Sequence, residues 1–145
     1  DVWVPGGFDE VTKKYPYDDA EKRILQAMQQ GTVKGVIWHQ GEADSDPKSA
    51  ALYLFKLQQL IARVRTLTKN PNLPFVAGEL GRFKKNAANI NQELAKLPAL
   101  VSYTAIVTSE GLDHKGDQLH FDAASANLLG KRYAEQMIRL QRPQQ

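Results

Sequence analysis

The sequence predicts an α/β fold in which helices cover both faces of a parallel β-sheet. Apolar segments of strand length alternate with segments of helical periodicity along the 145 residues, and polar, glycine-rich residues follow the strands. Alternation of this kind gives right-handed crossovers between parallel strands. The length fits a single domain with a hydrophobic core, and a composition of 42% hydrophobic and 24% charged residues is ordinary for a globular protein.

Four segments have helical periodicity, and we expect helices over residues 18–30, 46–68, 86–97 and 122–140. Asp18 and Asp19 are expected to provide a cap and the negative charge of the first turn in the first helix, and Pro98 is expected to stop the third. Apolar residues at three- and four-residue spacing predict the buried faces, which are Ala20, Ile24, Leu25 and Met28; Leu54, Leu57, Ile61 and Val64; Ala87, Ile90 and Leu94; and Ala126, Leu129, Tyr133, Met137 and Leu140.

Three apolar segments predict strands, over residues 33–38, 73–80 and 100–108. The first of these is followed at once by His39, Gln40, Gly41 and Glu42. The second ends in a similar polar and glycine-rich sequence, residues 78–82. Ligands of open α/β sheets bind outside the carboxyl ends of the strands, so both strand ends are expected at the edge that carries a functional site.

The charge and composition exclude several classes of partner. The formal net charge of +3 comes from scattered Lys and Arg without a long basic run, so no nucleic-acid partner is expected. No apolar segment approaches the length of a membrane span, and no membrane partner is expected. The absence of cysteine excludes disulfides and cysteine-ligated metals.

Two ordered motifs carry a resemblance to a known family. Residues 38–42, Trp-His-Gln-Gly-Glu, resemble the third conserved block of the sialate O-acetylesterase and acetylxylan esterase group, the carbohydrate-esterase branch of the SGNH-type serine hydrolases. Residues 116–122, Gly-Asp-Gln-Leu-His-Phe-Asp, are similar to the last block of that group, which carries the catalytic Asp and His three residues apart. Residues 3–7 and 130–134 also look like the family, whereas its first block, a Gly-Gln-Ser-Asn type sequence with the nucleophilic serine, is not in the sequence.

The resemblance implies a three-layer α/β/α fold with flavodoxin-like strand order, the SGNH hydrolase fold. Residues 1–145 would form one domain, the C-terminal portion of an esterase domain whose first two strands precede residue 1. The strand over residues 33–38 would be central in the whole protein, and in this chain alone it would be an open edge that is prone to pairing and aggregation. We therefore expect the N-terminal segment to be present as another chain, or a partner to cover the edge.

The resemblance also implies an acetylesterase acting on an acetylated carbohydrate, without a cofactor. His120 would be the general base and acid, oriented by Asp117 or, as an alternative or in shared duty, by Glu42. The amide of Gln40 would stabilise the oxyanion, and Gly41 would keep the approach free of a side chain. His39 and Trp3 are expected to contact substrate, although Trp3 equally fits an aromatic that pins a loop to the surface. The family further implies a secreted or periplasmic location.

The nucleophile and two competing functions remain open at this stage. The serines Ser45, Ser49, Ser102, Ser109 and Ser125 lack the flanking residues of the family, and of these only Ser45 lies near the predicted edge. We therefore expect the nucleophile upstream and this chain alone to be inactive. One alternative is a metal site made by His114, Asp117 and His120, and the other is a glycan-binding module that has the esterase fold but no activity.

Overall fold

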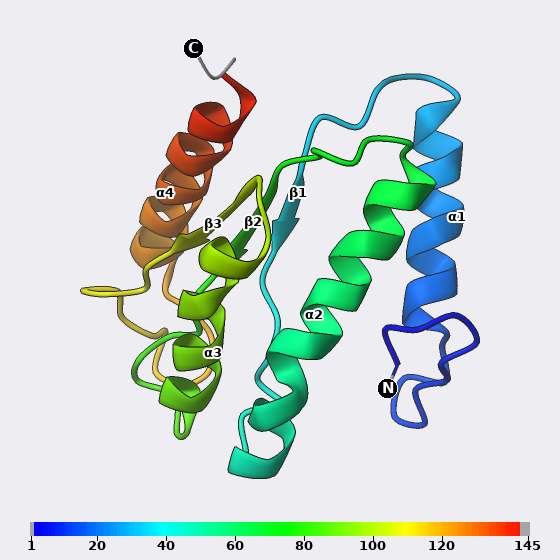
Figure 1. Ribbon diagram of the computed structural model, residues 1–145. Coiled ribbons are helices and arrows are strands. Elements are labelled where there is room, and N and C mark those ends of the chain that lie inside the picture. Colours follow the sequence, from blue (N-terminus) through cyan, green and yellow to red (C-terminus); the bar gives the residue numbers. More distant parts are fainter. Residues whose placement is uncertain (1, 143–145) are drawn as a thin grey trace.

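The computed structural model describes residues 2–142, and helices and strands alternate in it as predicted. In chain order (Figure 1) they are α1 (Pro16–Met28), β1 (Val36–Trp38), α2 (Pro47–Leu67), β2 (Phe75–Gly78), α3 (Ala87–Leu100), β3 (Thr104–Val107) and α4 (Ala123–Gln141). The strands are shorter than the predicted apolar segments, and of the third segment Leu100 belongs to α3 while residues 101–103 form a turn in which Tyr103 has a φ of +55°. No helix in this part of the chain is long and apolar enough to cross a membrane.

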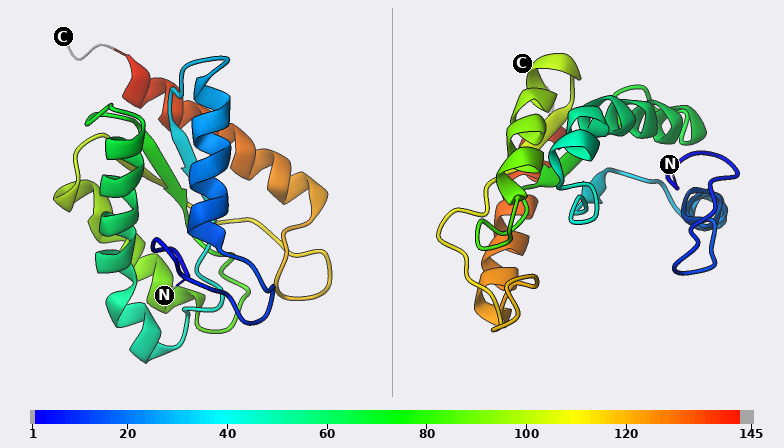
Figure 2. Two further views of the ribbon diagram at one scale, coloured as in Figure 1. Left: turned by 90° about the vertical axis from the view of Figure 1, so that its right-hand side faces the viewer. Right: turned by 90° about the horizontal axis from the view of Figure 1, so that it is seen from below.

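The three strands form a parallel sheet in the order β1-β2-β3. Helices α2 and α3 lie on one face of the sheet and α4 lies on the other (Figures 1 and 2). Within β2, Phe75 and Ala77 face the first layer, and Val76 faces Leu129 and Tyr133 of α4. The predicted three-layer α/β/α arrangement is therefore confirmed.

Helix α1 begins earlier than predicted. Pro16 is its first residue and Tyr15 precedes it without a side-chain cap, so the predicted cap by Asp18 or Asp19 is wrong, whereas their predicted negative charge in the first turn is confirmed. The fixed φ angle of proline suits the first helical position. The Asp18 carboxylate instead accepts hydrogen bonds from the backbone N–H of Gly6 at 3.1 and 3.2 Å, which holds the N-terminal loop against the helix.

Helix α3 continues past the proline that was expected to stop it. Pro98 lies inside the helix, which ends at Leu100. A proline in the last turn removes only one backbone donor, and the N–H of Val101 still closes the turn by bonding to Leu97 O at 2.9 Å.

Strand β1 is an open edge of the sheet in this chain. It pairs with β2 on one side, and Ile37 at its centre is 59% exposed. Helix α1 lies beside α2 at this end of the molecule (Figure 1), and its predicted buried residue Leu25 is 44% exposed. Ala126 of α4 is also exposed, contrary to prediction. The edge predicted for this strand is confirmed, and the helix beside it buries little of its apolar face.

Candidate active site at the carboxyl edge of the sheet

A hairpin-like loop between β3 and α4 carries the predicted base. Residues 113–122 fold back on themselves, with hydrogen bonds from Lys115 N to His120 O at 3.0 Å and from Asp122 N to Asp113 O at 3.1 Å. The N–H of Asp113 also bonds to the hydroxyl of Ser125 in the first turn of α4 at 2.8 Å. The loop, called the hairpin below, is thus fastened to the start of α4.

Within the hairpin, Asp117 and His120 form a preassembled pair. Asp117 Oδ2 lies 2.6 Å from His120 Nδ1, and Asp117 Oδ1 accepts the backbone N–H groups of Leu119 at 3.0 Å and His120 at 2.9 Å. The hydrogen bond to the His120 ring, followed by that to its backbone, holds the pKa of Asp117 well below its usual range. An ionised carboxylate on Nδ1 keeps the proton there and leaves the Nε2 lone pair free to accept another.

Aromatic contacts join the hairpin to the end of β1. The ring of Phe121 lies 5.8 Å from that of His39 and 5.3 Å from that of Phe83, measured between centroids, and both contacts are edge-on. His114 packs on Phe83 at 5.1 Å. Edge-on aromatic pairs add stability beyond the area that they bury. The sequence neighbours of His120 and Gln40 are therefore in direct contact.

The Gln40 backbone and side chain are both fixed. Its carbonyl accepts a hydrogen bond of 2.7 Å from the Tyr53 hydroxyl, which in turn accepts one of 3.1 Å from Trp38 Nε1. Its amide Nε2 donates to Asp44 Oδ2 at 2.9 Å. An amide nitrogen carries two hydrogens, so one N–H of Gln40 is oriented by Asp44 and the second remains for another acceptor.

Gly41 is required by packing rather than by access for a substrate. It is buried with a φ of +138°, and a Cβ on it would meet Ile90 Cγ2 at 2.9 Å and Tyr53 Cε2 at 3.4 Å. A side chain here would point into the core beside α2 and α3, not outward. The prediction that this glycine keeps the approach clear is therefore wrong in its physical reason.

His39 is held by the last helix. The Tyr133 hydroxyl donates to Trp38 O at 2.7 Å, so it accepts the hydrogen of His39 Nδ1 at 3.1 Å. Packing against Phe121 and Tyr133 lowers the pKa of His39, and the charge of Glu42 opposes this effect. His39 is thus a neutral imidazole near pH 7 whose Nε2 is an acceptor.

Glu42 lies near His39 and not against the predicted base. Among residues 2–142 no hydrogen bond joins the Glu42 carboxylate to His120, whereas Asp117 makes one. The backbone carbonyl of Glu42 accepts the Ser45 hydroxyl at 2.8 Å. Asp117 is therefore the carboxylate that the structure places on the imidazole.

The serines of this chain have other tasks. Ser45 is 6% exposed, donates to Glu42 O and accepts from Lys84 Nζ at 3.0 Å, so its hydroxyl is already engaged. Ser109 is fully buried and bonds to Leu80 O at 2.8 Å, and Ser125 is 7% exposed. Ser49 lies in the first turn of α2 with its N–H on Asp46, and Ser102 is exposed beyond α3.

The described residues give no support to the metal alternative. Within residues 2–142, no group of three or more His, Cys, Asp or Glu side chains is arranged to hold a metal ion. His114 Nδ1 accepts the backbone N–H of Gly116 at 2.9 Å, and its ring packs on Phe83. Its role is to shape the hairpin rather than to join Asp117 and His120 as a ligand.

A cavity of about 380 Å³ adjoins Gln40. Trp3, Trp38, Asp44 and Tyr53 contribute to its walls. The ring of Trp3 stands edge-on to that of Trp38 at a centroid distance of 4.8 Å. Trp3 is therefore both packed on the domain, as its alternative interpretation predicts, and placed beside the candidate site.

Sequence reasoning missed the residues that hold the site together from elsewhere in the fold. Tyr53 of α2 and Tyr133 of α4 read as ordinary core residues of amphipathic helices, although their hydroxyls fix Gln40 and His39. Glu79, after β2, bonds to the start of the loop that follows β3. The only signal in the sequence was the polar end of the second strand.

Comparisons with known proteins agree with this geometry. The model of a family described as carbohydrate esterase, sialic acid-specific acetylesterase, matches residues 1–139. The structure is similar to the X-ray structure of a protein from Arabidopsis thaliana, with a TM-score of 0.78 and 26% sequence identity over 85% of this chain. The match spans 52% of the Arabidopsis chain, so the present chain corresponds to about half of its length. Because the family model matches nearly all of the sequence, this chain belongs to the carbohydrate esterase family of sialic acid-specific acetylesterases.

Proposed function

We propose that this chain supplies the base, the acid that orients it and the oxyanion donor of a serine esterase. The enzyme would remove acetyl groups from sugar hydroxyls, with acetylated xylan or O-acetylated sialic acid as substrate. The observation that carries the proposal is the 2.6 Å contact between Asp117 and His120 in a hairpin that packs, through Phe121, on His39, the residue before Gln40. Membership of the carbohydrate esterase family supports the same class of reaction.

The proposed reaction follows from the orientation of the His120 ring. Its Nε2 removes the proton of a serine hydroxyl as the serine oxygen attacks the acetyl carbon, and it then gives this proton to the departing sugar oxygen. Water, activated by the same nitrogen, hydrolyses the acetyl-serine to acetate. Asp117 fixes the tautomer and stabilises the imidazolium that forms in both steps.

The oxyanion of each tetrahedral intermediate would be stabilised by Gln40. Asp44 accepts one hydrogen of the Gln40 side-chain amide and Tyr53 donates to the Gln40 backbone carbonyl, so the remaining N–H is oriented before substrate binds. A fixed donor of this kind contributes about 10²- to 10³-fold in rate. Glu42 acts on this proposal through its charge near His39, secondary to Asp117.

We place the nucleophilic serine upstream of this chain, on a segment that pairs with the open edge of β1. Support comes from the engaged hydroxyls of Ser45 and Ser109 and from the exposure of Ile37 on that edge. The segment would be either part of the same polypeptide or a second chain. A secreted or periplasmic location fits a polysaccharide substrate and belongs to the proposal. Cell fractionation tests it, and recovery only from the cytoplasm would refute it.

The experiment that tests the function uses protein expressed from its complete coding sequence. Acetate release would be measured from acetylated xylan, O-acetylated sialic acid and p-nitrophenyl acetate, with and without a fluorophosphonate that modifies active serines. We expect turnover that the inhibitor abolishes, together with a mass increase on one upstream serine peptide. Binding of acetylated glycan without acetate release would instead identify a glycan-binding module, and turnover that only a chelator stops would restore the metal alternative.

A further inference from the structure

The beginning of the loop after β3 is held by a carboxylate from the neighbouring strand. Glu79 follows β2, and its side chain is only 15% exposed. Its Oε2 accepts the Thr108 hydroxyl at 2.9 Å, the Ser109 N–H at 2.9 Å and the Ser109 hydroxyl at 3.4 Å. Arg82 Nη2 lies 3.3 Å from the same oxygen. A carboxylate largely removed from water needs such donors, and here they come mainly from the loop.

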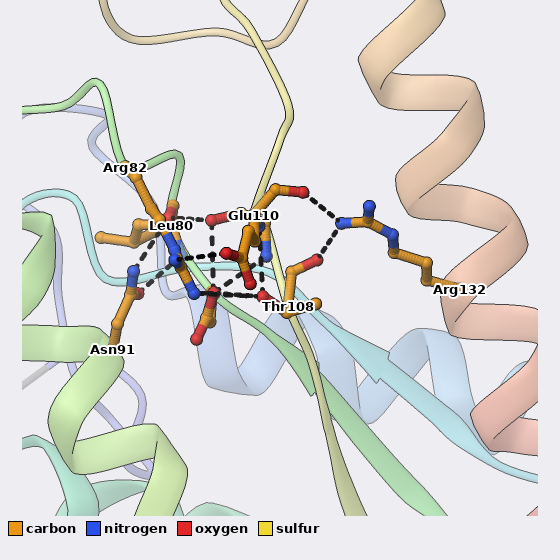
Figure 3. Close-up of polar contacts among 8 residues, drawn as sticks. Leu80, Arg82, Asn91, Thr108, Glu110 and Arg132 are labelled. Atoms are coloured by element: carbon orange, nitrogen blue, oxygen red, sulfur yellow. Dashed lines mark hydrogen bonds and ion pairs between the residues drawn. The ribbon is translucent and has the colours of Figure 1, made fainter.

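The same short segment is held from the other side by a cation. Arg132 of α4 donates through Nη1 to Thr108 O at 2.7 Å and to Glu110 O at 3.0 Å. Figure 3 shows Arg132 approaching from α4, while Arg82 and Asn91 lie on the opposite side. The Glu79 carboxylate therefore accepts hydrogen bonds from Thr108 and Ser109. The Arg132 guanidinium donates to the carbonyls of Thr108 and Glu110. We call Glu79 and Arg132 the clamp.

The clamped segment leads directly into the hairpin. Leu112 N bonds to Ser109 O at 3.1 Å, and Asp113 N bonds to Ser125 Oγ at 2.8 Å. The hairpin then closes on itself between residues 113 and 122. Its position relative to the end of β1 is therefore set at its root by the clamp and, at the end of its returning arm, by the contact of Phe121 with His39.

We infer that Glu79 and Arg132 are positioning residues, which fix the Asp117 and His120 pair relative to the end of β1 without touching the reacting atoms. This inference rests on the proposed esterase function. The reaction needs Nε2 of His120 and the amide of Gln40 at fixed separations from one acetyl group, and these two groups lie on loops that follow different strands. A misplacement of about 1 Å costs on the order of 10²-fold in rate. A clamp that ties β2, β3 and α4 to the hairpin root prevents such a displacement.

The hydrogen bonds of Glu79 are directed at the loop after β3 and at Arg82. Its Oε2 already serves Thr108, Ser109 and Arg82, and Ser109 is fully buried beneath it. The clamp therefore acts through the backbone of the loop, and it is the placement of His120 that its removal changes.

The test uses protein expressed from its complete coding sequence with two variants of the clamp and a matched control. Glu79→Gln keeps the size of the side chain but removes the charge, and Arg132→Met keeps the aliphatic stem but removes the donors. The control is Glu110→Gln, because the Glu110 carboxylate is 73% exposed and contacts only Arg82, at 3.8 Å, among the described residues. Arg132→Lys restores the charge and tests for rescue.

We expect kcat for p-nitrophenyl acetate to fall by about 10- to 100-fold in both clamp variants, with KM changed by no more than about twofold. Arg132→Lys should recover part of the loss, and the control should resemble the parent. A second readout needs no turnover: the His120 Nδ1 proton, observed by NMR in the bond to Asp117, should exchange faster in the clamp variants.

Two results would overturn the inference. One is that the folded variants show a lower melting temperature but retain kcat within about twofold and an unchanged His120 signal, which would mean that the clamp only stabilises the fold. The other is an equal loss in the Glu110→Gln control. If Glu79→Gln does not fold, the comparison of Arg132→Lys with Arg132→Met gives the same answer. If the parent releases no acetate while the clamp variants lose the His120 signal, the proposed function fails and the positional role of Glu79 and Arg132 stands.

Discussion

The three histidines of this chain lie in the same region of the molecule, yet each has a different set of hydrogen bonds. Nδ1 of His39 donates to Tyr133, and Nδ1 of His114 accepts backbone N–H groups. Only His120, among the described residues, has a carboxylate within hydrogen-bond distance of its ring. Three identical side chains are therefore assigned to three roles by their partners, and His120 has the partner that a general base requires.

Replacement of Asp117 by Asn should lower kcat by about 10³- to 10⁴-fold, because an amide cannot hold His120 in the tautomer that leaves Nε2 free. Acetate release by protein expressed from the complete coding sequence is the measurement. Asp113→Asn is the matched control, since Asp113 lies in the same hairpin, is exposed and bonds through Oδ1 to a backbone N–H that an Asn oxygen also accepts. Equal losses in the two variants would contradict the assignment of Asp117.

His39 gives a prediction about stability and pH. Its pKa is lowered in the folded chain, so the unfolded chain binds the proton more readily, and stability should decrease as the pH falls below about 6.5. His39→Asn places an amide N–H near the position of Nδ1 but does not titrate. Urea denaturation at pH 7.5 and pH 5.5 should show a smaller loss in His39→Asn than in the parent. An unchanged loss would assign the pH dependence to other groups.

At the residue scale, the sequence was sufficient for groups that lie within one motif and insufficient for groups that are joined by folding. Asp117 and His120 are three positions apart, so their pairing follows from a short loop. Glu79 and Ser109 are separated by 30 residues, and nothing in either local sequence predicts their bond. Gly41 was predicted for the wrong reason, because the neighbour that excludes a side chain there, Ile90, comes from α3.

At the scale of the elements, helix α2 does more than cover the sheet. Its predicted buried face is confirmed, with Leu54, Leu57, Ile61 and Val64 all buried. On the same face, the buried Tyr53 hydroxyl links Trp38 of β1 to the backbone of Gln40. Burial raises the pKa of this hydroxyl, which therefore stays protonated and remains a donor. Helix α2 thus fixes the backbone position of Gln40, one of the polar residues that follow β1.

Tyr53→Phe should decrease the free energy of unfolding by about 1–3 kcal/mol, because Trp38 Nε1 and Gln40 O lose their shared partner inside the protein. It should also reduce kcat, since Gln40 is then less well fixed. Tyr15→Phe is the control, because Tyr15 is half exposed and its ring packs on Phe8. Urea denaturation gives the first quantity and acetate release the second. A loss of stability without a loss of kcat would show that Tyr53 serves packing alone.

Helix ends were the least predictable elements, and each error has a local physical reason. Pro98 does not stop α3, because a proline in the last turn costs one hydrogen bond and the turn still closes on Leu97. Asp18 does not cap α1, because Pro16 starts the helix earlier and the carboxylate binds the N-terminal loop instead. Asp46 and Asp122 do cap α2 and α4, as predicted, by accepting backbone N–H groups.

At the scale of the whole molecule, the fold was predictable because alternating apolar segments determine a parallel sheet with helices on both faces. The order β1-β2-β3 confirms that the apolar strand after residue 33 lies at an edge in this chain. Among residues 2–142 no strand pairs with the other side of β1, and the upstream segment that we propose would cover it. The exposure of Ile37 on this edge supports that proposal.

The isolated chain of 145 residues should self-associate through this edge, and Ile37→Lys should weaken the association. Sedimentation velocity over a range of concentrations is the measurement. Leu25→Lys serves as the control, because Leu25 is comparably exposed but lies on α1 and not on a strand. If both substitutions reduce association equally, nonspecific hydrophobic association and not strand pairing is responsible. A monomer at all concentrations would refute the prediction.

The open edge of β1 separates the proposed catalytic groups into two sets that meet only when a strand pairs there. The proposed base, its carboxylate and the proposed oxyanion donor are hydrogen-bonded within this chain. An esterase divided at this edge would therefore be inactive as two separate halves and active when the halves associate. Release of a coloured product would then report the association of the two halves. The chain would in that case serve as one half of a split reporter enzyme.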